Sequence, residues 1–280
     1  MDSKRESNLK EKIIEVVNVS RRIGQGSGYV DVLDNVDFYA RRGEVVSVIG
    51  PSGCGKSTFL DILAGLERPD SGTVTVQGLH TENLLGSVGY MQQKDLLLPW
   101  RTVMNNVILG LEMQGISKKI ARRQATERMD SFGLSGFEDH YPYALSGGMR
   151  QRAAFLRTIL TDTSVLLLDE PFSALDALNR SHMQEWLLNL LESYDEKTVV
   201  LVTHDVEEAL FLSDRIYVMS PRPGRIAVAE KIVWDLPRSR NLLSTQQFTE
   251  TKSRILSYLL SSCLLYTSDA ADDTPCVDLG

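Results

Sequence analysis

The sequence predicts an α/β fold in which helices cover both faces of an open, mostly parallel sheet. Near-continuous apolar runs, typical of strands buried on both faces, occur at Val45–Ile49, Val165–Asp169 and Thr198–Thr203. Segments with helical periodicity alternate with these runs, at residues 57–64 and 179–192. The composition, 42% hydrophobic and 24% charged, agrees with an ordinary globular chain.

The first part of the chain is expected to be rich in short strands. Residues 1–12 are polar, so we expect a flexible tail without the apolar core of a secretory signal. Strand-like patterns follow at residues 13–19 and 32–40. Two further strands are predicted at residues 73–77 and 88–91, after the first helix and its turn.

The middle of the chain changes to a charged, helical pattern. Helical periodicity covers residues 103–132 and 149–160. We therefore expect an inserted helical subdomain over about residues 95–160. The buried-strand pattern then returns, and its last run lies at residues 215–220.

Charge and cysteine content exclude several classes of protein. The chain has 30 Lys and Arg against 37 Asp and Glu, a net charge of −7, which argues against non-specific nucleic-acid binding. Its longest uncharged stretch, residues 255–268, falls short of the roughly 20 apolar residues of a membrane-spanning helix. Three cysteines, Cys54, Cys263 and Cys276, cannot form a disulfide framework and indicate a reducing compartment.

Residues 50–58 read G-P-S-G-C-G-K-S-T, between a predicted strand and a predicted helix. Glycines let the backbone amides turn inward around a phosphate, and the helix adds its positive end. Lys56 would supply a charge to the β- and γ-phosphates, and Ser57 a hydroxyl to Mg²⁺. The alternative is a glycine-rich turn without a ligand. The predicted nucleotide-binding residues are Gly50, Ser52, Gly53, Cys54, Gly55, Lys56, Ser57 and Thr58. The same helix end is expected to make the Cys54 thiol partly reactive.

Residues 165–170 read V-L-L-L-D-E, an apolar strand that ends in two acids. Asp169 would lie beside the phosphate loop and help to hold Mg²⁺ through water. Glu170 would act as the general base on the attacking water. The alternative is a strand that ends in a solvated acidic turn.

Residues 145–152 read L-S-G-G-M-R-Q-R and predict a second anion site. Ser146 is a suitable helix N-cap, and Gly147 and Gly148 expose the first amides of the helix. A chain with one phosphate loop has no evident use for this site. We therefore expect it to cap the γ-phosphate of a nucleotide held by another copy; the alternative is an ordinary capped helix.

With these motifs the sequence resembles the ATP-binding-cassette ATPases. In addition, D-E-P-F-S-A-L-D at residues 169–176 resembles the end of their magnesium-binding strand and their D-loop. T-H-D at residues 203–205 resembles their switch-histidine loop. Gln92 and Gln93 occupy the position of their glutamine loop. The resemblance covers about residues 13–262. It implies a P-loop NTPase with a RecA-like core sheet, an N-terminal antiparallel β subdomain and the helical insert. The ATPase domain would span residues 13–235, and 236–262 would be a C-terminal extension.

The resemblance also implies roles for single residues. Glu170 would be the catalytic base, His204 would contact the γ-phosphate, and Gln93 rather than Gln92 would sense Mg²⁺ and water. The implied catalytic residues are Glu170, His204, Gln93 and Lys56, and the implied Mg²⁺ site is Ser57, Gln93 and Asp169. Two head-to-tail copies would enclose two ATP molecules, with Ser146, Gly147 and Gly148 on the opposite nucleotide and Asp176 communicating across the dimer. In this family an aromatic residue ahead of the phosphate loop usually stacks on the adenine. A glycine-rich stretch disturbs the alignment of that region here, so Tyr29 is the candidate aromatic residue and Ile23 is the apolar alternative.

Residues 96–107, L-L-L-P-W-R-T-V-M-N-N-V, resemble motors of nitrate, sulfonate and taurine importers. This implies a peripheral protein on the cytoplasmic face of a bacterial membrane, bound to integral permease subunits and served indirectly by an extracytoplasmic solute-binding protein. Leu97, Leu98 and Trp100 would form the docking surface, or else pack within the helical subdomain. Thiamine-precursor importers use similar motors, so the solute stays open. The alternative is a soluble cassette ATPase acting on nucleic acid or ribosomes, which usually carries two cassettes or long coiled coils.

Residues 263–280 depart from the family pattern. Residues 263–273, C-L-L-Y-T-S-D-A-A-D-D, resemble the translation of a sequencing adapter. We therefore predict that 263–280 is a non-native tail; the alternative is a variable, solvated terminus.

Overall fold

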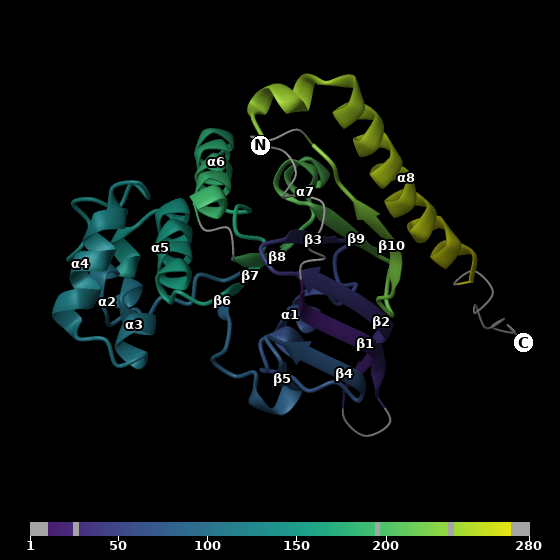
Figure 1. Cartoon of the computed structure of the whole chain (residues 1–280), viewed down its shortest axis with the longest axis horizontal. Coiled ribbons are helices and arrows are strands. Elements are labelled where there is room, and N and C mark those ends of the chain that lie inside the picture. Colours follow the sequence, from purple (N-terminus) through teal and green to yellow (C-terminus); the bar gives the residue numbers. More distant parts are fainter. Residues whose placement is uncertain (1–10, 25–27, 194–196, 235–237, 270–280) are drawn as a thin grey trace, which may run out of the picture.

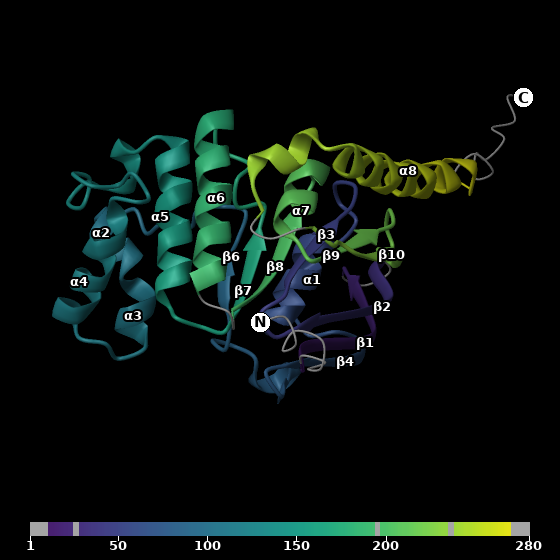
Figure 2. The same cartoon turned by 45° about the horizontal axis from the view of Figure 1, so that its top comes forward.

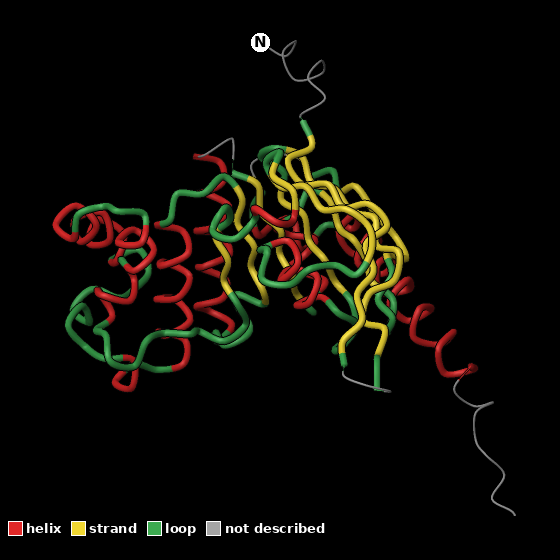
Figure 3. Tube along the Cα trace, turned by 90° about the horizontal axis from the view of Figure 1, so that it is seen from below, coloured by secondary structure: helices red, strands yellow, loops and turns green. Residues whose placement is uncertain are grey.

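The computed structural model describes residues 11–24, 28–193, 197–234 and 238–269. Two sheets form one half of the molecule and a group of helices forms the other (Figure 1). Seen from below, the strands lie together on one side, and the helical part beyond them contains no strand (Figure 3). The predicted α/β fold class is confirmed.

The larger sheet has six strands and carries the apolar runs found in the sequence. Its order is β10 (Ile226–Lys231), β9 (Arg215–Met219), β3 (Val45–Ile49), β8 (Thr198–Thr203), β7 (Val165–Asp169) and β6 (Gly89–Met91). The strands from β9 to β6 are parallel, and only β10 is antiparallel to its neighbour. Every residue of β3, β7 and β8 is buried, as expected for strands covered on both faces.

The smaller sheet is antiparallel and lies next to the core sheet. Its order is β2 (Val30–Arg41), β1 (Lys12–Ile23), β4 (Ser71–Val76) and β5 (Leu79–His80), followed by a 3₁₀ turn at Thr81–Asn83. Strand β1 begins at Lys12, so this last residue of the predicted tail belongs to the sheet. Helix α1 (Lys56–Leu63) joins the two sheets, because its Phe59 packs edge-on against Phe38 of β2.

The helical insert contains α2 (Val103–Val107), α3 (Leu109–Met113), α4 (Lys118–Met129) and α5 (Gly147–Leu160), with a 3₁₀ turn at Pro142–Ala144 before α5. The segment predicted to be helical over residues 103–132 is therefore three helices, with Ile108 as the cap between the first two. Helix α6 (Ala177–Ser193) lies beside α5 (Figure 2). Trp186 of α6 meets the rings of Phe132 and Phe155, which fixes the insert to the core.

The C-terminal part covers the β9–β10 end of the core sheet. It consists of α7 (Val206–Leu212), a 3₁₀ segment (Arg240–Ser244) and the long α8 (Gln246–Asp269), which runs along this edge in Figure 1. Trp234, Phe248 and Ile255 are buried together there. Helix α8 continues past residue 262, where the sequence predicts the start of a non-native tail; residues 270–280 of that tail lie outside the described residues, as do residues 1–10. Among the described residues, no helix has the length and apolarity needed to cross a membrane.

Candidate active site

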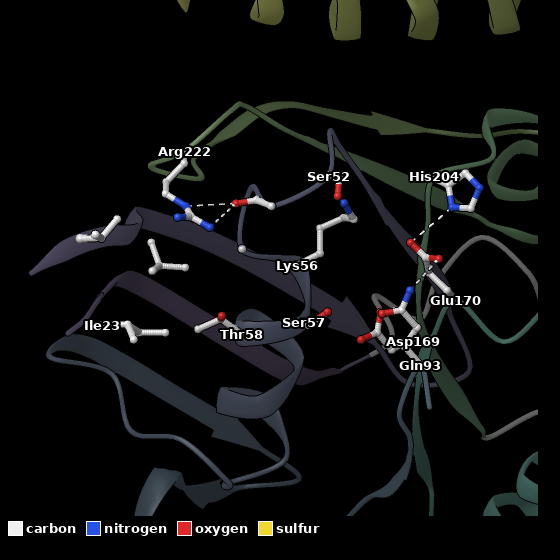
Figure 4. A pocket seen from close by; sticks show the side chains of 14 residues that line it. Ile23, Ser52, Lys56, Ser57, Thr58, Gln93, Asp169, Glu170, His204 and Arg222 are labelled. Atoms are coloured by element: carbon white, nitrogen blue, oxygen red, sulfur yellow. Dashed lines mark hydrogen bonds and ion pairs between the residues drawn. The ribbon is translucent and has the colours of Figure 1, made fainter. Parts of the chain in front are cut away.

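One cavity lies where the parallel strands end. Its volume is about 630 Å³ (Figure 4). All five parallel strands, β9, β3, β8, β7 and β6, lead into loops that line it, because the carboxyl ends of parallel strands share one edge of a sheet. The lining residues are Ile23, Val30, Val32, Ser52, Gly53, Gly55, Lys56, Ser57, Thr58, Gln93, Asp169, Glu170, His204 and Arg222.

The phosphate loop connects β3 to α1 and forms the floor of this cavity. Gly55 has a φ of +108°, and a Cβ there would lie 2.8 Å from Leu33 Cδ2, so the loop needs glycine at this position. Lys56 is buried, and its Nζ donates to the carbonyl oxygens of Gly50 at 2.8 Å and Pro51 at 2.9 Å. These bonds hold the ammonium group inside the curve of the loop, where it can meet a phosphate.

Asp169 closes β7 beside the phosphate loop and is only 4% exposed. Burial raises the pKa of its carboxyl group, while a hydrogen bond from Ser57 opposes the rise. A buried carboxylate, a hydroxyl and the Gln93 amide are oxygen donors of the kind that Mg²⁺ prefers, and a cation would offset the buried charge. The described residues hold no group of three His, Cys, Asp or Glu side chains suited to a metal, so phosphate and water would have to complete the coordination.

Glu170 lies between two side chains that come from neighbouring strand ends. Its Oε2 accepts from Gln93 Nε2 at 3.3 Å, and its Oε1 lies 3.3 Å from His204 Nδ1 (Figure 4). The backbone at Glu170 has a φ of +48°, and its N–H donates to the Val202 carbonyl at 2.9 Å. A carboxylate oriented by two partners on the wall of a cavity has the geometry of a general base.

The second group of predicted residues lies elsewhere. Ser146, Gly147, Gly148 and Asp176 do not line the cavity of their own chain. Ser146 caps α5, since its Oγ accepts from the Met149 N–H at 3.2 Å, and both Ser146 and Gly147 are exposed. Asp176 accepts from the Asn179 N–H at 3.0 Å, and the hydrogen bonds from Asn179 lower the pKa of its carboxyl group.

The adenine-stacking candidate, Tyr29, is 63% exposed and lies outside the cavity lining. Its alternative, Ile23, forms an apolar wall with Val30 and Val32. Cys54 also differs from expectation: its side chain is 1% exposed, and burial raises the pKa of the thiol despite the nearby charge of Lys56. Desolvation therefore outweighs the helix end, and the expected thiolate is not favoured.

Sequence reasoning missed Arg222 as a lining residue. Its Nε and Nη2 donate to the Gly53 carbonyl at 3.1 and 2.9 Å. The available signal was its place in the turn after a buried strand, because β9 is parallel to β3 and ends at the same edge.

Comparison with known proteins agrees with this geometry. Residues 33–173 match the family described as ABC transporter. The aliphatic sulfonates import ATP-binding protein SsuB of Bacillus cereus is 40% identical over 255 residues, which cover 91% of this chain and 99% of that protein. The formylaminopyrimidine import ATP-binding protein ThiZ of Halalkalibacterium halodurans is 43% identical over 235 residues, covering 83% and 92%.

A solved structure supports the same assignment. The dimeric, post-hydrolysis structure of the ATP-binding cassette MJ0796, bound to ADP and Pi, superposes with a TM-score of 0.73 at 32% identity, covering 79% of this chain and 100% of that one. Fold, motif geometry and relatives agree, so the chain belongs to the ABC transporter family and is an ATP-hydrolysing, ATP-binding protein of that family.

Proposed function

We propose that this chain is the ATPase subunit of a membrane importer for a small solute of the nitrate, sulfonate, taurine or thiamine-precursor kind. Two relatives with import-related names support this, and they match at 40% and 43% identity although their named solutes differ. Sequence similarity between ATPase subunits therefore does not identify the transported solute. The selection of the solute belongs to the membrane and binding subunits that the motor serves.

The observation that carries the proposed chemistry is the position of Glu170 between Gln93 and His204, on the same cavity as Lys56. The amides of the phosphate loop and Lys56 bind the phosphates of ATP. Glu170 takes a proton from the attacking water, and His204 orients the carboxylate and the γ-phosphate. Mg²⁺, held by Ser57, Asp169 and Gln93, would neutralise phosphate charge when bound.

The active form is proposed to be a head-to-tail dimer of two copies. Residues 146–148 begin α5 and do not line the cavity of their own chain, and Ser146 and Gly147 are exposed. In the dimer they would face the γ-phosphate in the opposite cavity, and Asp176 would lie at the contact between copies. The dimeric state of the similar solved cassette supports this arrangement.

The loop after Gln93 is proposed to receive the permease subunits. Trp100 is 72% exposed and Leu96 is also exposed. Leu98 is half-buried and Leu97 is buried, so Leu97 does not offer the docking surface expected of it. Exposed apolar side chains in a loop suit a protein contact. The motor would then lie peripherally on the cytoplasmic face of the membrane, reach the extracytoplasmic solute-binding protein only through the permease, and have no nucleic-acid partner.

The test begins with ATP hydrolysis by Glu170→Gln. This variant should keep ATP binding and lose on the order of 10²–10⁴-fold in rate, because the general base is removed while the phosphate loop stays intact. Glu67→Gln, a partly exposed carboxylate that pairs with Arg21, is the matched control and should hydrolyse at the normal rate.

The importer part of the proposal is tested by purification from the native membrane. We expect the chain to co-purify with a hydrophobic permease and to show ATPase activity stimulated by it. Co-purification with RNA or ribosomes, and hydrolysis stimulated by them, would contradict this part even if the Glu170 result holds.

A further inference from the structure

The turn between β9 and β10, residues 220–225, connects the phosphate loop to strand β2. The Gly224 N–H donates to the Val32 carbonyl at 2.8 Å, and the Gly224 carbonyl accepts from the Asp34 N–H at 3.1 Å. A Cβ on Gly224 would lie 2.2 Å from the Cys54 carbonyl oxygen, so the turn packs directly on the backbone of the phosphate loop. The turn is therefore fixed relative to both walls of the cavity.

Arg222 is the side chain that this turn presents to the cavity. Both of its bonds to the Gly53 carbonyl use the Nε–Nη2 edge of the guanidinium group. Edge-on hydrogen bonds fix the orientation of the plane and leave its flat faces unused by those bonds. Figure 4 shows Arg222 toward the end of the cavity where Ile23 lies, away from Glu170 and His204.

That end of the cavity is apolar but holds no large aromatic ring. Ile23, Val30 and Val32 line it, and none of the described lining residues is Phe, Tyr or Trp. Apolar side chains can pack on one face of an adenine ring, and a flat group stacks well on the other. An arginine guanidinium provides one, since it stacks on aromatic systems and adds a cation–π attraction.

We propose that Arg222 contacts the base of the nucleotide, with its guanidinium group stacked on the adenine above the apolar wall that includes Ile23. This inference rests on the proposed nucleotide site. It assigns to the β9–β10 turn the stacking role for which Tyr29 was the candidate from the sequence. The turn then binds the base and supports the phosphate loop with one side chain.

The test compares ADP with inorganic pyrophosphate by isothermal titration calorimetry. Neither the comparison nor its readout depends on hydrolysis. Arg222→Ala should weaken ADP binding roughly tenfold more than it weakens pyrophosphate binding, because only ADP has a base and the lost support of the phosphate loop affects both ligands. Arg222→Lys keeps a charge and a donor for the Gly53 carbonyl but not the flat group, so ADP binding should stay weak.

Two control variants separate the possible outcomes. Arg225→Ala removes the other arginine of the turn, which pairs with Asp34 and does not line the cavity, and should bind both ligands normally. Lys56→Ala should weaken both ligands. If Arg222→Ala weakens both ligands equally, or neither, Arg222 only supports the loop and the inference is wrong. If the wild-type chain binds neither ligand, or Lys56→Ala changes nothing, the proposed site itself is wrong.

Discussion

Two adjacent carboxylates, Asp169 and Glu170, are proposed to take different roles, and they lie in different surroundings because the strand ends between them. Asp169 is still part of β7, so its side chain is buried and hydrogen-bonded by Ser57. At Glu170 the backbone has a φ of +48° and leaves the strand direction, which brings its carboxylate between Gln93 and His204. A change of backbone conformation at one residue thus separates the proposed metal ligand, Asp169, from the proposed base, Glu170.

Cys54 gives a prediction about reactivity. Because burial raises the pKa of this thiol, little thiolate exists at pH 8, and alkylation should be slow. We expect iodoacetamide to label the Cys54 peptide at least about tenfold more slowly in the folded protein than in urea, as measured by mass spectrometry. Peptide mapping keeps Cys54 apart from Cys263 and Cys276. Equal labelling rates in folded and unfolded protein would show that the thiol is accessible and ionised.

Glu208 on α7 gives a prediction about pH. Its side chain is 5% exposed; burial raises its pKa to about 7, although hydrogen bonds from Thr203 and Gln184 lower it. The ordinary pKa is 4.5, so between about pH 4.5 and 7 the folded state keeps a proton that the unfolded state releases. Stability from this group is therefore lost as the pH rises through that window.

The Glu208→Gln variant has no titratable carboxyl group at this position. Its free energy of unfolding, measured in urea, should improve relative to wild type by roughly 3 kcal/mol between pH 4.5 and 8. Glu207→Gln changes the exposed neighbour that pairs with Lys252 and should show no comparable trend. The same pH dependence in both variants would mean that Glu208 is not the group responsible.

At the scale of elements, the sequence predicts best what is decided locally. The strands at Val45–Ile49, Val165–Asp169 and Thr198–Thr203 are found as predicted, because a strand buried on both faces must be apolar throughout. Lys56, Glu170 and His204 follow such strands, and parallel strand ends meet, so their presence around one cavity was also predictable.

Contacts between distant segments account for what the sequence did not predict. Tyr29 lies outside the cavity lining, whereas Ile23, Val30 and Val32 line it, and Arg222 lines the same cavity from a turn nearly two hundred residues away. The helix end at the phosphate loop predicts a reactive Cys54, whereas burial of its side chain raises the pKa of the thiol. Such long-range packing carries no local signal.

The β9–β10 turn gives a prediction about the phosphate loop. In Gly224→Ala the new methyl group would overlap a backbone oxygen, that of Cys54, so the backbone itself must move. We expect a loss of about 3 kcal/mol or more in the free energy of unfolding, with weaker ATP binding. Gly78→Ala is the control: it has a φ of +76° and no atom within 4 Å, so it should cost only about 1–2 kcal/mol from backbone strain and leave ATP binding intact. Similar effects of both variants on ATP binding would show that the contact with the loop is unimportant.

At the scale of the whole molecule, the cavity and the proposed second anion site, residues 146–148, are separate in one chain. The cavity lies at the carboxyl edge of the core sheet, whereas Ser146 begins α5, in the helical insert. Residues 146–148 begin α5 and so belong to the insert, which packs on α6 through Phe155 and Trp186 (Figure 2). A nucleotide that bridges two copies would thereby couple its own binding to the position of the insert.

The separation of the two sites predicts complementation between two inactive variants. Lys56→Ala removes the charge of the phosphate loop. Ser146→Asp keeps a good N-cap for α5 but places a negative charge where the opposite γ-phosphate would lie. Each variant alone should lose ATPase activity. Each cavity of the dimer combines the phosphate loop of one copy with Ser146 of the other, so the same defect is present in both cavities.

In a mixed dimer both defects fall in the same cavity, and the other cavity joins an intact phosphate loop to an intact Ser146. Equal mixing should restore up to about a quarter of the wild-type rate, since half of the dimers are mixed and each holds one intact cavity. The measurement is phosphate release by each variant alone and by the mixture at the same total concentration. If Ser146 instead acts on the nucleotide of its own chain, the mixture will show no more activity than the average of the two variants.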